Sequence, residues 1–202
     1  MMRNTMMTHL PKHIRSTLFT AASLGVMAFS STAMADATPE CNEDTVGGTT
    51  SLECGRNSDA SGANGSTAVG ANSNATGSES TAVGETADAT GDQSVAVGEN
   101  AQANGLRTVA LGEDSVADQQ FTTALGNLAR ATAEGATAVG ISSDASGPNS
   151  TTLGRNADAT GVAAISIGAE SDANADEAIA IGGDGDGPVR SNAPASGFRV
   201  IS

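Results

Sequence analysis

Residues that could perform chemistry are scarce in this sequence after position 35. Both histidines and the single lysine precede that position, and the chain has no tryptophan or tyrosine. Serine and threonine are abundant, but without a histidine none has the base that would activate it as a nucleophile. The 23 acidic residues recur as a repeating pattern and not as one isolated pair, which argues against glycoside hydrolysis. We therefore expect a protein that is not an enzyme and that binds no cofactor.

Two acidic patterns could hold a cation. Residues 182–187 form a glycine- and aspartate-rich run that is similar to a calcium-binding turn, but it occurs once, whereas calcium-binding β-rolls repeat it many times. Glu85, Glu99 and Glu113 recur at one position of a repeat, so their like charges would lie close together in a stacked structure. Solvent and salt can screen that repulsion without a bound ion. We therefore expect no metal site.

Cys41 and Cys54 are the only cysteines, and their separation is close to the length of the repeat described below. If Cys41 lies on a coil that precedes the repeats, the two Cα atoms would be about 5 Å apart, within disulfide range. An oxidising compartment outside the cytoplasm would allow the bond. We expect an intrachain disulfide that caps the N-terminal end of the repeats, and a bridge between chains is the alternative.

The first 35 residues are typical of a secretory signal peptide. Arg3, Lys12 and Arg15 make a basic start, residues 18–29 are apolar and uncharged, and Ala33-Met34-Ala35 matches the small-x-small cleavage signal. The apolar run is shorter than the roughly 20 residues that span a bilayer. We therefore expect cleavage before Asp36, export, and no membrane-spanning segment in the mature chain; an uncleaved anchor is the alternative.

The mature chain is strongly acidic. All 23 acidic residues but only six arginines follow residue 35, which gives a charge of −17. Such a charge repels nucleic acid and anionic membranes, and the mature chain lacks the basic patches and numerous stacking aromatic residues of nucleic-acid-binding proteins, with Phe121 and Phe198 as its only aromatic residues. We expect no nucleic-acid partner. With so few large apolar residues, composition alone would indicate disorder, but a strict repeat argues against it.

The repeat is marked by a glycine that recurs every fourteen residues, and each copy of it ends a short apolar run. A fixed short period indicates one structural unit stacked on copies of itself. The period glycines are Gly70, Gly84, Gly98, Gly112, Gly126, Gly140, Gly154, Gly168 and Gly182. Each unit holds two strand-like segments and two turns. The second strand-like segment alternates alanine or serine with polar residues.

Alternation within the first strand-like segment separates its side chains onto two faces. Its third position is small and usually alanine, whereas its second position is β-branched and its fourth is always valine, leucine or isoleucine. The fourth-position residues are Val69, Val83, Val97, Leu111, Leu125, Val139, Leu153, Ile167 and Ile181. One coil leaves this column exposed, and a contiguous apolar patch of this kind marks an interaction surface.

The sequence therefore predicts an all-β chain folded as a flattened parallel β-roll of 14-residue coils with a thin alanine and serine interior. We expect an irregular N-terminal lead-in over residues 36–50, the repeats over 51–182 and a Gly/Asp/Pro-rich tail over 183–202. The first unit is one residue longer than the others, so we expect that residue to loop out near residues 61–64.

The runs Ser94-Val95-Ala96-Val97-Gly98 and Ala178-Ile179-Ala180-Ile181-Gly182, each joined to Ala-x-Ala-x-Gly-like spacers, resemble the head repeats of trimeric autotransporter adhesins. The resemblance covers about residues 51–182. It implies a left-handed β-roll, a homotrimer with the fourth-position column as its interface, and a head at the cell surface that binds host matrix proteins or other cells. No segment after Gly182 resembles the stalk or membrane anchor of that family, so surface retention or secretion stays open.

Two other functions stay open at this level. The same trimer could serve as a secreted structural or matrix protein without binding a host. A flat β-solenoid with a regular threonine array could also order water and bind ice. Here the threonine column is interrupted by Val95, Val109, Ile165 and Ile179, and the adjacent column is wholly aliphatic, which suits packing against protein better.

Overall fold

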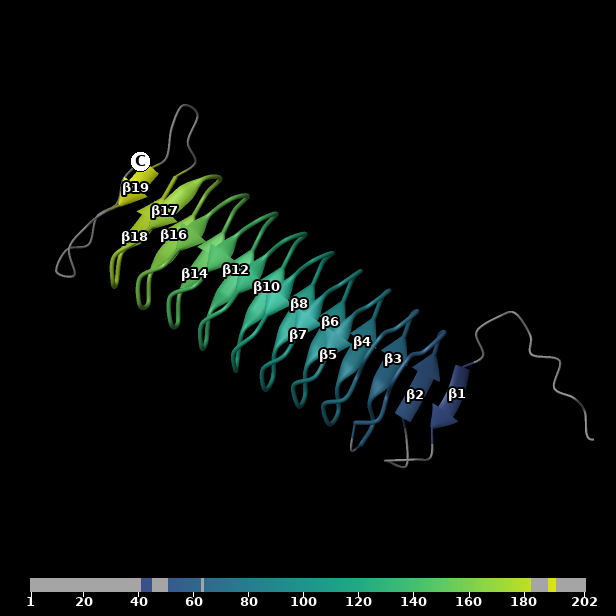
Figure 1. The fold of residues 1–202 in the computed structure, drawn as a ribbon. Helices are drawn as coiled ribbons and strands as arrows, with labels where there is room; N and C mark the ends of the chain where they lie inside the picture. Colours follow the sequence, from purple (N-terminus) through teal and green to yellow (C-terminus); the bar gives the residue numbers. More distant parts are fainter. Residues whose placement is uncertain (1–40, 45–50, 63, 183–188, 192–202) are drawn as a thin grey trace, which may run out of the picture. The chain divides into compact units, whose positions relative to one another are not determined.

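The computed structural model describes residues 41–44, 51–62, 64–182 and 189–191. The expected signal peptide, most of the lead-in and most of the tail lie outside these residues. Between residues 51 and 182 the chain winds through successive coils, each of which gives a short strand to one or both of two sheets (Figure 1). Apart from its first strand, the chain forms a parallel β-solenoid, as the sequence predicts.

Sheet A is the larger sheet and contains 11 strands. In spatial order they are β1 (Cys41–Asp44), β2 (Ser51–Cys54), β3 (Thr67–Val69), β4 (Thr81–Val83), β6 (Val95–Val97), β8 (Val109–Leu111), β10 (Thr123–Leu125), β12 (Thr137–Val139), β14 (Thr151–Leu153), β16 (Ile165–Ile167) and β18 (Ile179–Ile181). The strands from β3 onward hold the second to fourth positions of the predicted first segment.

Sheet B contains eight strands. They are β5 (Asp88–Ala89), β7 (Gln102–Ala103), β9 (Val116–Ala117), β11 (Arg130–Ala131), β13 (Asp144–Ala145), β15 (Asp158–Ala159), β17 (Ser171–Ala173) and β19 (Val189–Ser191). Two isolated bridges, Asp59 with Asn74 and Asn74 with Asp88, continue this ladder toward the first coil. From β5 to β17, sheet B is the predicted second segment of each unit, whereas β19 lies in the predicted tail and adds a strand that the sequence did not predict.

In sheet A the register repeats without slips from β3 onward. Ala82 pairs with Ala96, and each later strand of sheet A pairs in parallel with the strand 14 residues further on. Neighbouring parallel strands lie about 4.8 Å apart. In the first coil Leu52 pairs with Thr67, a step of 15 residues. Gly62 makes the same backbone hydrogen bond as Gly77 in the next coil, and Asn64 makes the same one as Ser78. The extra residue of the first unit therefore falls between Gly62 and Asn64, within the predicted segment.

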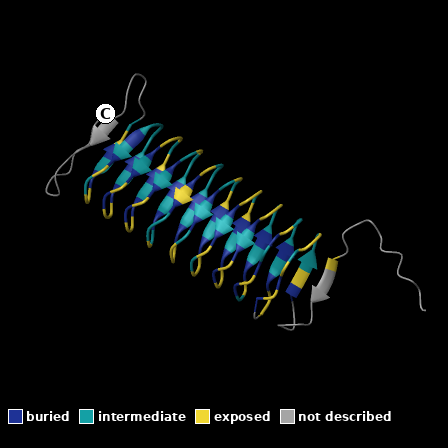
Figure 2. Ribbon diagram, in the orientation of Figure 1, coloured by how far each residue is buried: buried dark blue, intermediate teal, exposed yellow. Residues whose placement is uncertain are grey.

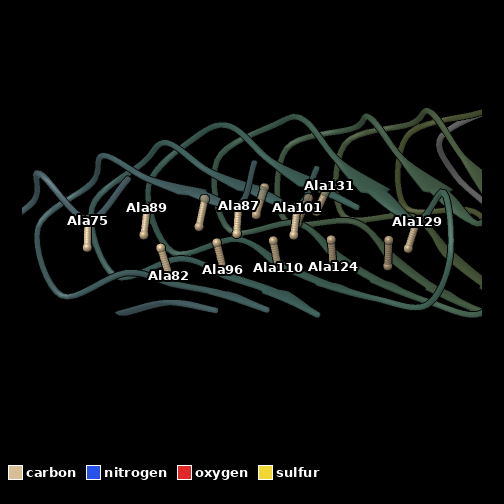
Figure 3. Close-up of a cluster of buried hydrophobic side chains, with 14 of the residues drawn as sticks. Ala75, Ala82, Ala87, Ala89, Ala96, Ala101, Ala110, Ala124, Ala129 and Ala131 are labelled. Carbon is tan, nitrogen blue, oxygen red and sulfur yellow. The ribbon is translucent and has the colours of Figure 1, made fainter. Parts of the chain in front are cut away.

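Alanine side chains fill the interior between the two sheets (Figure 3). The alanines at the third position of sheet A, such as Ala96 and Ala110, and those of sheet B, such as Ala103, are 0% exposed. Figure 2 shows the same alternation, with a buried residue between two more exposed ones in each sheet A strand from β3 onward. The interior is therefore as thin as the sequence predicts, because small side chains let the sheets approach closely.

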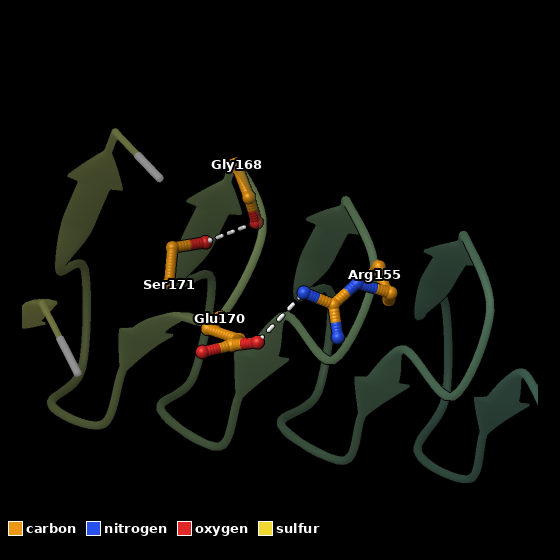
Figure 4. Close-up of polar contacts among 4 residues, drawn as sticks. All are labelled: Arg155, Gly168, Glu170 and Ser171. Carbon is orange, nitrogen blue, oxygen red and sulfur yellow. Dashed lines mark hydrogen bonds and ion pairs between the residues drawn. The ribbon is translucent and has the colours of Figure 1, made fainter. Parts of the chain in front are cut away.

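Buried hydroxyl groups line both edges of this interior and are mostly bonded to the turns. Ser80 Oγ donates to the carbonyl oxygen of Gly77 at 2.7 Å, and Thr108 Oγ1 donates to that of Gly105 at 2.8 Å. Ser171 Oγ makes the same bond to Gly168 in a later coil (Figure 4). The turns are thus tied to the core by side chains as well as by backbone.

The period glycine is required by two constraints at once. Gly84 has a φ of +139°, a conformation that residues with a Cβ rarely adopt. A Cβ at this position would also collide with the carbonyl oxygen of Gly98 in the next coil. The same two conditions recur at Gly112, where the collision is with Gly126. This close approach of stacked turns explains why the glycine recurs in each unit.

The N-terminal end of the stack is covered by an antiparallel strand. Strand β1 runs antiparallel to β2 and places Cys41 directly opposite Cys54. The two residues are disulfide-bonded in the structure, with Cα atoms 4.1 Å apart. The lead-in over residues 36–50 was expected to be irregular, but residues 41–44 form a strand, and the two cysteines meet because an antiparallel pair brings the start of one strand opposite the end of the next. Glu53 Oε1 also accepts the Ala60 N–H at 2.6 Å.

Candidate interaction surface

The outer side of sheet A carries the column of fourth-position residues that the sequence singled out. The structure brings all of them into one line, because each pairs in register with the next; Val83 pairs with Val97 and Leu125 with Val139. The members are Val69, Val83, Val97, Leu111, Leu125, Val139, Leu153, Ile167 and Ile181. Their side chains are partly buried or exposed, up to 49% at Leu153.

The second-position residues form a parallel column on the same side of sheet A. Thr81, Val95 and Val109 are partly buried and stand beside the fourth-position column in successive strands. We refer to the two columns together as the apolar face. Its residues point away from the alanine interior and are uncharged throughout, in a chain whose net charge is −14. The chain therefore presents a continuous apolar surface that nothing in the described residues covers.

The outer side of sheet B is polar and partly acidic. Asp144, Asp158 and Asp172 occupy one position of three adjacent strands and pair in register. Burial raises the pKa of Asp158, and the neighbouring carboxylates of Asp144 and Asp172 raise it further. Burial also raises the pKa of Asp144, although the Arg130 guanidinium on the adjacent strand partly offsets this. The outer side of sheet B therefore carries ionisable side chains, unlike the apolar face.

The turn residues form hydrogen-bonded ladders between coils. Asn104 Nδ2 donates to Asp118 Oδ1 at 2.9 Å, and Arg107 Nε donates to Gln93 Oε1 at 2.8 Å, each across a step of 14 residues. In a later pair of coils Arg155 forms an ion pair with Glu170, 2.7 Å between Nη2 and Oε1 (Figure 4). These exposed contacts contribute little individually.

No metal centre emerges from the residues that the structure describes. They contain no group of three or more histidine, cysteine, aspartate or glutamate side chains placed to hold an ion. Glu85, Glu99 and Glu113 stand exposed on one row of turns. The glycine- and aspartate-rich run lies outside the described residues apart from its first glycine. The part of the chain that the structure describes contains no helix long and apolar enough to cross a membrane.

Sequence reasoning missed a second group of apolar side chains, which lie in the turns. Leu106, Phe121, Leu128, Ile141 and Val162 are all exposed large hydrophobic residues. Most turn residues are glycine, asparagine, aspartate or serine, so we expected polar turns and did not single out these apolar residues. The signal was nevertheless present, because each of these residues departs from the polar residues that occupy most of its fourteen-residue column.

The fold and its surface define a class: a short-repeat parallel β-solenoid with one uncharged apolar face along its whole length. The family model that matches is the YadA head domain repeat, and its matches cover residues 60–87, 89–112, 103–129, 131–157 and 159–184. The chain therefore belongs to the YadA head family, a family of adhesin-type heads. A search of curated proteins finds no match.

Proposed function

We propose that this chain is a non-enzymatic adhesin head that assembles as a homotrimer through its apolar face. Three solenoids would bury their fourth-position columns around a common axis and leave sheet B and the turns in water. The trimer would then bind extracellular-matrix proteins or other cells through many weak copies of one surface. Export by the predicted signal peptide would place it at the cell surface or in the medium.

The observation that supports this proposal best is the apolar face itself. A column such as Val97, Leu111 and Leu125 stays partly exposed on a single chain, over the full length of the solenoid. An exposed apolar surface of that extent is a liability for a lone exported protein, and covering it with further copies removes the liability. The family membership supports the same reading, because it relates the chain to adhesin heads.

Binding can be tested with the purified chain from residue 36 onward. Wild type is applied to immobilised matrix proteins and to cell monolayers, beside a variant with Leu111→Asp and Leu125→Asp in the apolar face. Multivalent attachment multiplies the affinity of weak contacts, so wild type should bind and the variant should bind far less. Light scattering on the same samples reports whether wild type is a trimer. A trimer that attaches to no matrix protein or cell would contradict adhesion and favour a structural role.

Ice binding is a second candidate because of one specific feature of the apolar face. Thr123, Thr137 and Thr151 lie in register on three adjacent strands of sheet A and are partly exposed. Ordered threonine rows on a flat solenoid can order water. Thermal hysteresis of the purified protein distinguishes this function, since an adhesin head should show none and an ice-binding solenoid should show a clear gap between melting and freezing.

A further inference from the structure

Two rows of turns run along opposite edges of the solenoid (Figure 1). We call the turns that follow sheet A strands the first row; their tips are the two residues after each period glycine, such as Glu99 and Asn100. We call the turns that lead back into sheet A the second row, with tips such as Asp92 and Gln93. Both rows are exposed and mostly polar, so apolar tips stand out from their neighbours.

Each row carries one apolar pair on adjacent coils. Leu128 and Ile141 form the pair in the first row, and Ile141 is 55% exposed. Leu106 and Phe121 form the pair in the second row, and Phe121 is 48% exposed. The Phe121 N–H donates to the Leu106 carbonyl oxygen at 2.9 Å, which fixes the two tips beside each other.

The backbone at these tips does not favour bulky side chains. Phe121 and Leu128 have φ values of +61° and +59°, in the left-handed region. Glycine or asparagine suits that region best, and the next coil of the second row has Gly135 at the equivalent place. Large apolar residues at such positions are unfavourable for the isolated chain, so a contact with a partner is the natural reason to hold them there.

The two pairs lie at nearly the same level of the solenoid. Phe121 precedes and Leu128 follows the same strand, β10 (Thr123–Leu125). Leu106 lies one coil before that level and Ile141 one coil after it, and one coil corresponds to about 4.8 Å along the axis. When three copies are related by a threefold axis, one edge of each copy faces the opposite edge of the next, and residues at equal levels meet.

We propose that the Leu128–Ile141 pair of one copy packs against the Leu106–Phe121 pair of the next copy, closing the rim of the trimer at the level of β10. This inference rests on the trimer of the proposed function and adds a head-to-tail contact that the apolar face does not require. The partner is a second copy of this chain because apolar pairs occur on its two opposite edges and overlap at the level of β10, where Phe121 and Leu128 lie.

Charge disfavours contact at two earlier levels of the solenoid. The first row carries Glu85 and Glu99 at the levels of β4 and β6, and the second row carries Glu79 and Asp92 at the same two levels. Edges that meet there would oppose like charges, which disfavours contact. Val162, three coils beyond Phe121, faces no apolar pair in the described part of the first row, so we assign it no contact.

Cysteine cross-linking tests the pairing directly. The double variant Phe121→Cys with Leu128→Cys is treated with a mild oxidant or a short bifunctional thiol reagent, with the native Cys41–Cys54 bond left intact. Head-to-tail closure should convert it to a covalent trimer on a denaturing gel. The single variants should give only monomers, because equivalent residues lie far apart around the axis. The control Phe121→Cys with Glu85→Cys, three coils apart, should also stay monomeric.

The outcomes separate this inference from the proposed function. A trimer by light scattering in which neither Phe121→Cys with Leu128→Cys nor Phe121→Cys with Ile141→Cys cross-links would overturn the rim contact and leave the trimer intact. Thiols at positions 121 and 128 that react freely with a labelling reagent in the trimer would overturn it too, and would leave the pairs open to another ligand. A wild type that is monomeric would overturn both proposals together.

Discussion

At the scale of single residues, three buried hydroxyl groups among the described residues lack a hydrogen-bond partner, those of Ser94, Ser150 and Thr152, and Thr152 is the one that lies in the alanine column. The third-position column is alanine in most coils, but β14 has Thr152 and β16 has Ser166. Ser166 Oγ is bonded to Ser171, with 2.6 Å between the two hydroxyl oxygens. Thr152 Oγ1 is buried and has no hydrogen-bond partner among the described residues. Burying an unsatisfied polar group costs about 1–3 kcal/mol.

Replacing Thr152 by valine should therefore stabilise the fold. The substitution keeps the shape of the side chain and removes the unpaired hydroxyl, so the free energy of unfolding should rise by about 1 kcal/mol. Thr122→Val is the matched control, because Thr122 Oγ1 donates to the Gln119 carbonyl oxygen at 2.7 Å. That change should lower the free energy by a similar amount. Urea unfolding of both variants decides the question, and equal effects of the same sign would refute the distinction.

Titration of the aspartate ladder should make the protein less stable as pH rises. Burial and the carboxylates of Asp144 and Asp172 raise the pKa of Asp158 in the folded state above its usual value. The folded state then holds its proton more tightly than the unfolded state, so stability is greatest at acidic pH and falls as pH rises through the folded pKa. Asp158→Asn should flatten this dependence between about pH 4 and 7.

Thermal unfolding at a series of pH values measures the effect. Asp158→Asn should raise the midpoint at pH 7 relative to wild type and bring the curves together in acid. Glu177→Gln, a neutralisation at an exposed turn, is the control and should leave the slope unchanged. A wild type that gains stability steadily as pH rises from 4 to 7 would show that the ladder does not control this range.

At the scale of elements, the turns after sheet A are the tightest points of the stack. Gly112→Ala would place a Cβ against the carbonyl oxygen of Gly126 at a φ of +139°, and should cost more than about 2 kcal/mol. Gly135→Asn is the matched control, since its φ of +69° suits asparagine and its nearest neighbour is the movable side chain of Asn149. The control should change stability by less than 1 kcal/mol, roughly. If denaturant unfolding shows that Gly112→Ala and Gly135→Asn lose similar amounts of stability, this account is contradicted.

The N-terminal strand pair gives a separate prediction about covalent structure. In the exported protein Cys41 and Cys54 should form an intrachain bond, so the wild type should run as a monomer on a non-reducing denaturing gel. Removing the bond with Cys41→Ser and Cys54→Ser should lower hydrogen-exchange protection in β1 and β2 while leaving β10 unchanged, because the bond holds only the first strand. Covalent dimers of wild type would favour the bridge between chains instead.

The regular strands could be predicted from the sequence because the residues that produce them recur with a fixed period. The spacing of Gly84 and Gly98 sets the coil length, and the alternation around Ala96 decides which side chains enter the interior. The direction of β1 was not predictable, since the period begins only after it. The apolar turn pairs were missed for a related reason: turn composition predicts polar tips, and the meaning of Phe121 and Leu128 depends on their shared level in three dimensions.

At the scale of the whole molecule, the interior alone provides little stabilisation. Alanine methyl groups fill it, and at about 25 cal/mol per Å² each contributes a small burial term. Ordering each backbone residue costs about 1–2 kcal/mol of conformational entropy. The fourth-position column, with Leu111 and Leu125 near its middle, adds a larger burial term only when other chains cover it. Folding and trimerisation should therefore be coupled.

The direct test combines mass by light scattering with circular dichroism on one pair of variants. Leu111→Asp with Leu125→Asp places unpaired charges in the covered face, three copies of each around the axis, and should abolish both the trimer and the β-sheet signal. Gln119→Asp with Ser146→Asp adds the same charges at exposed positions and should leave a folded trimer. Wild type should be a folded trimer. A well-folded monomer from the leucine variant would contradict the coupling, and a folded monomeric wild type would contradict the trimer itself.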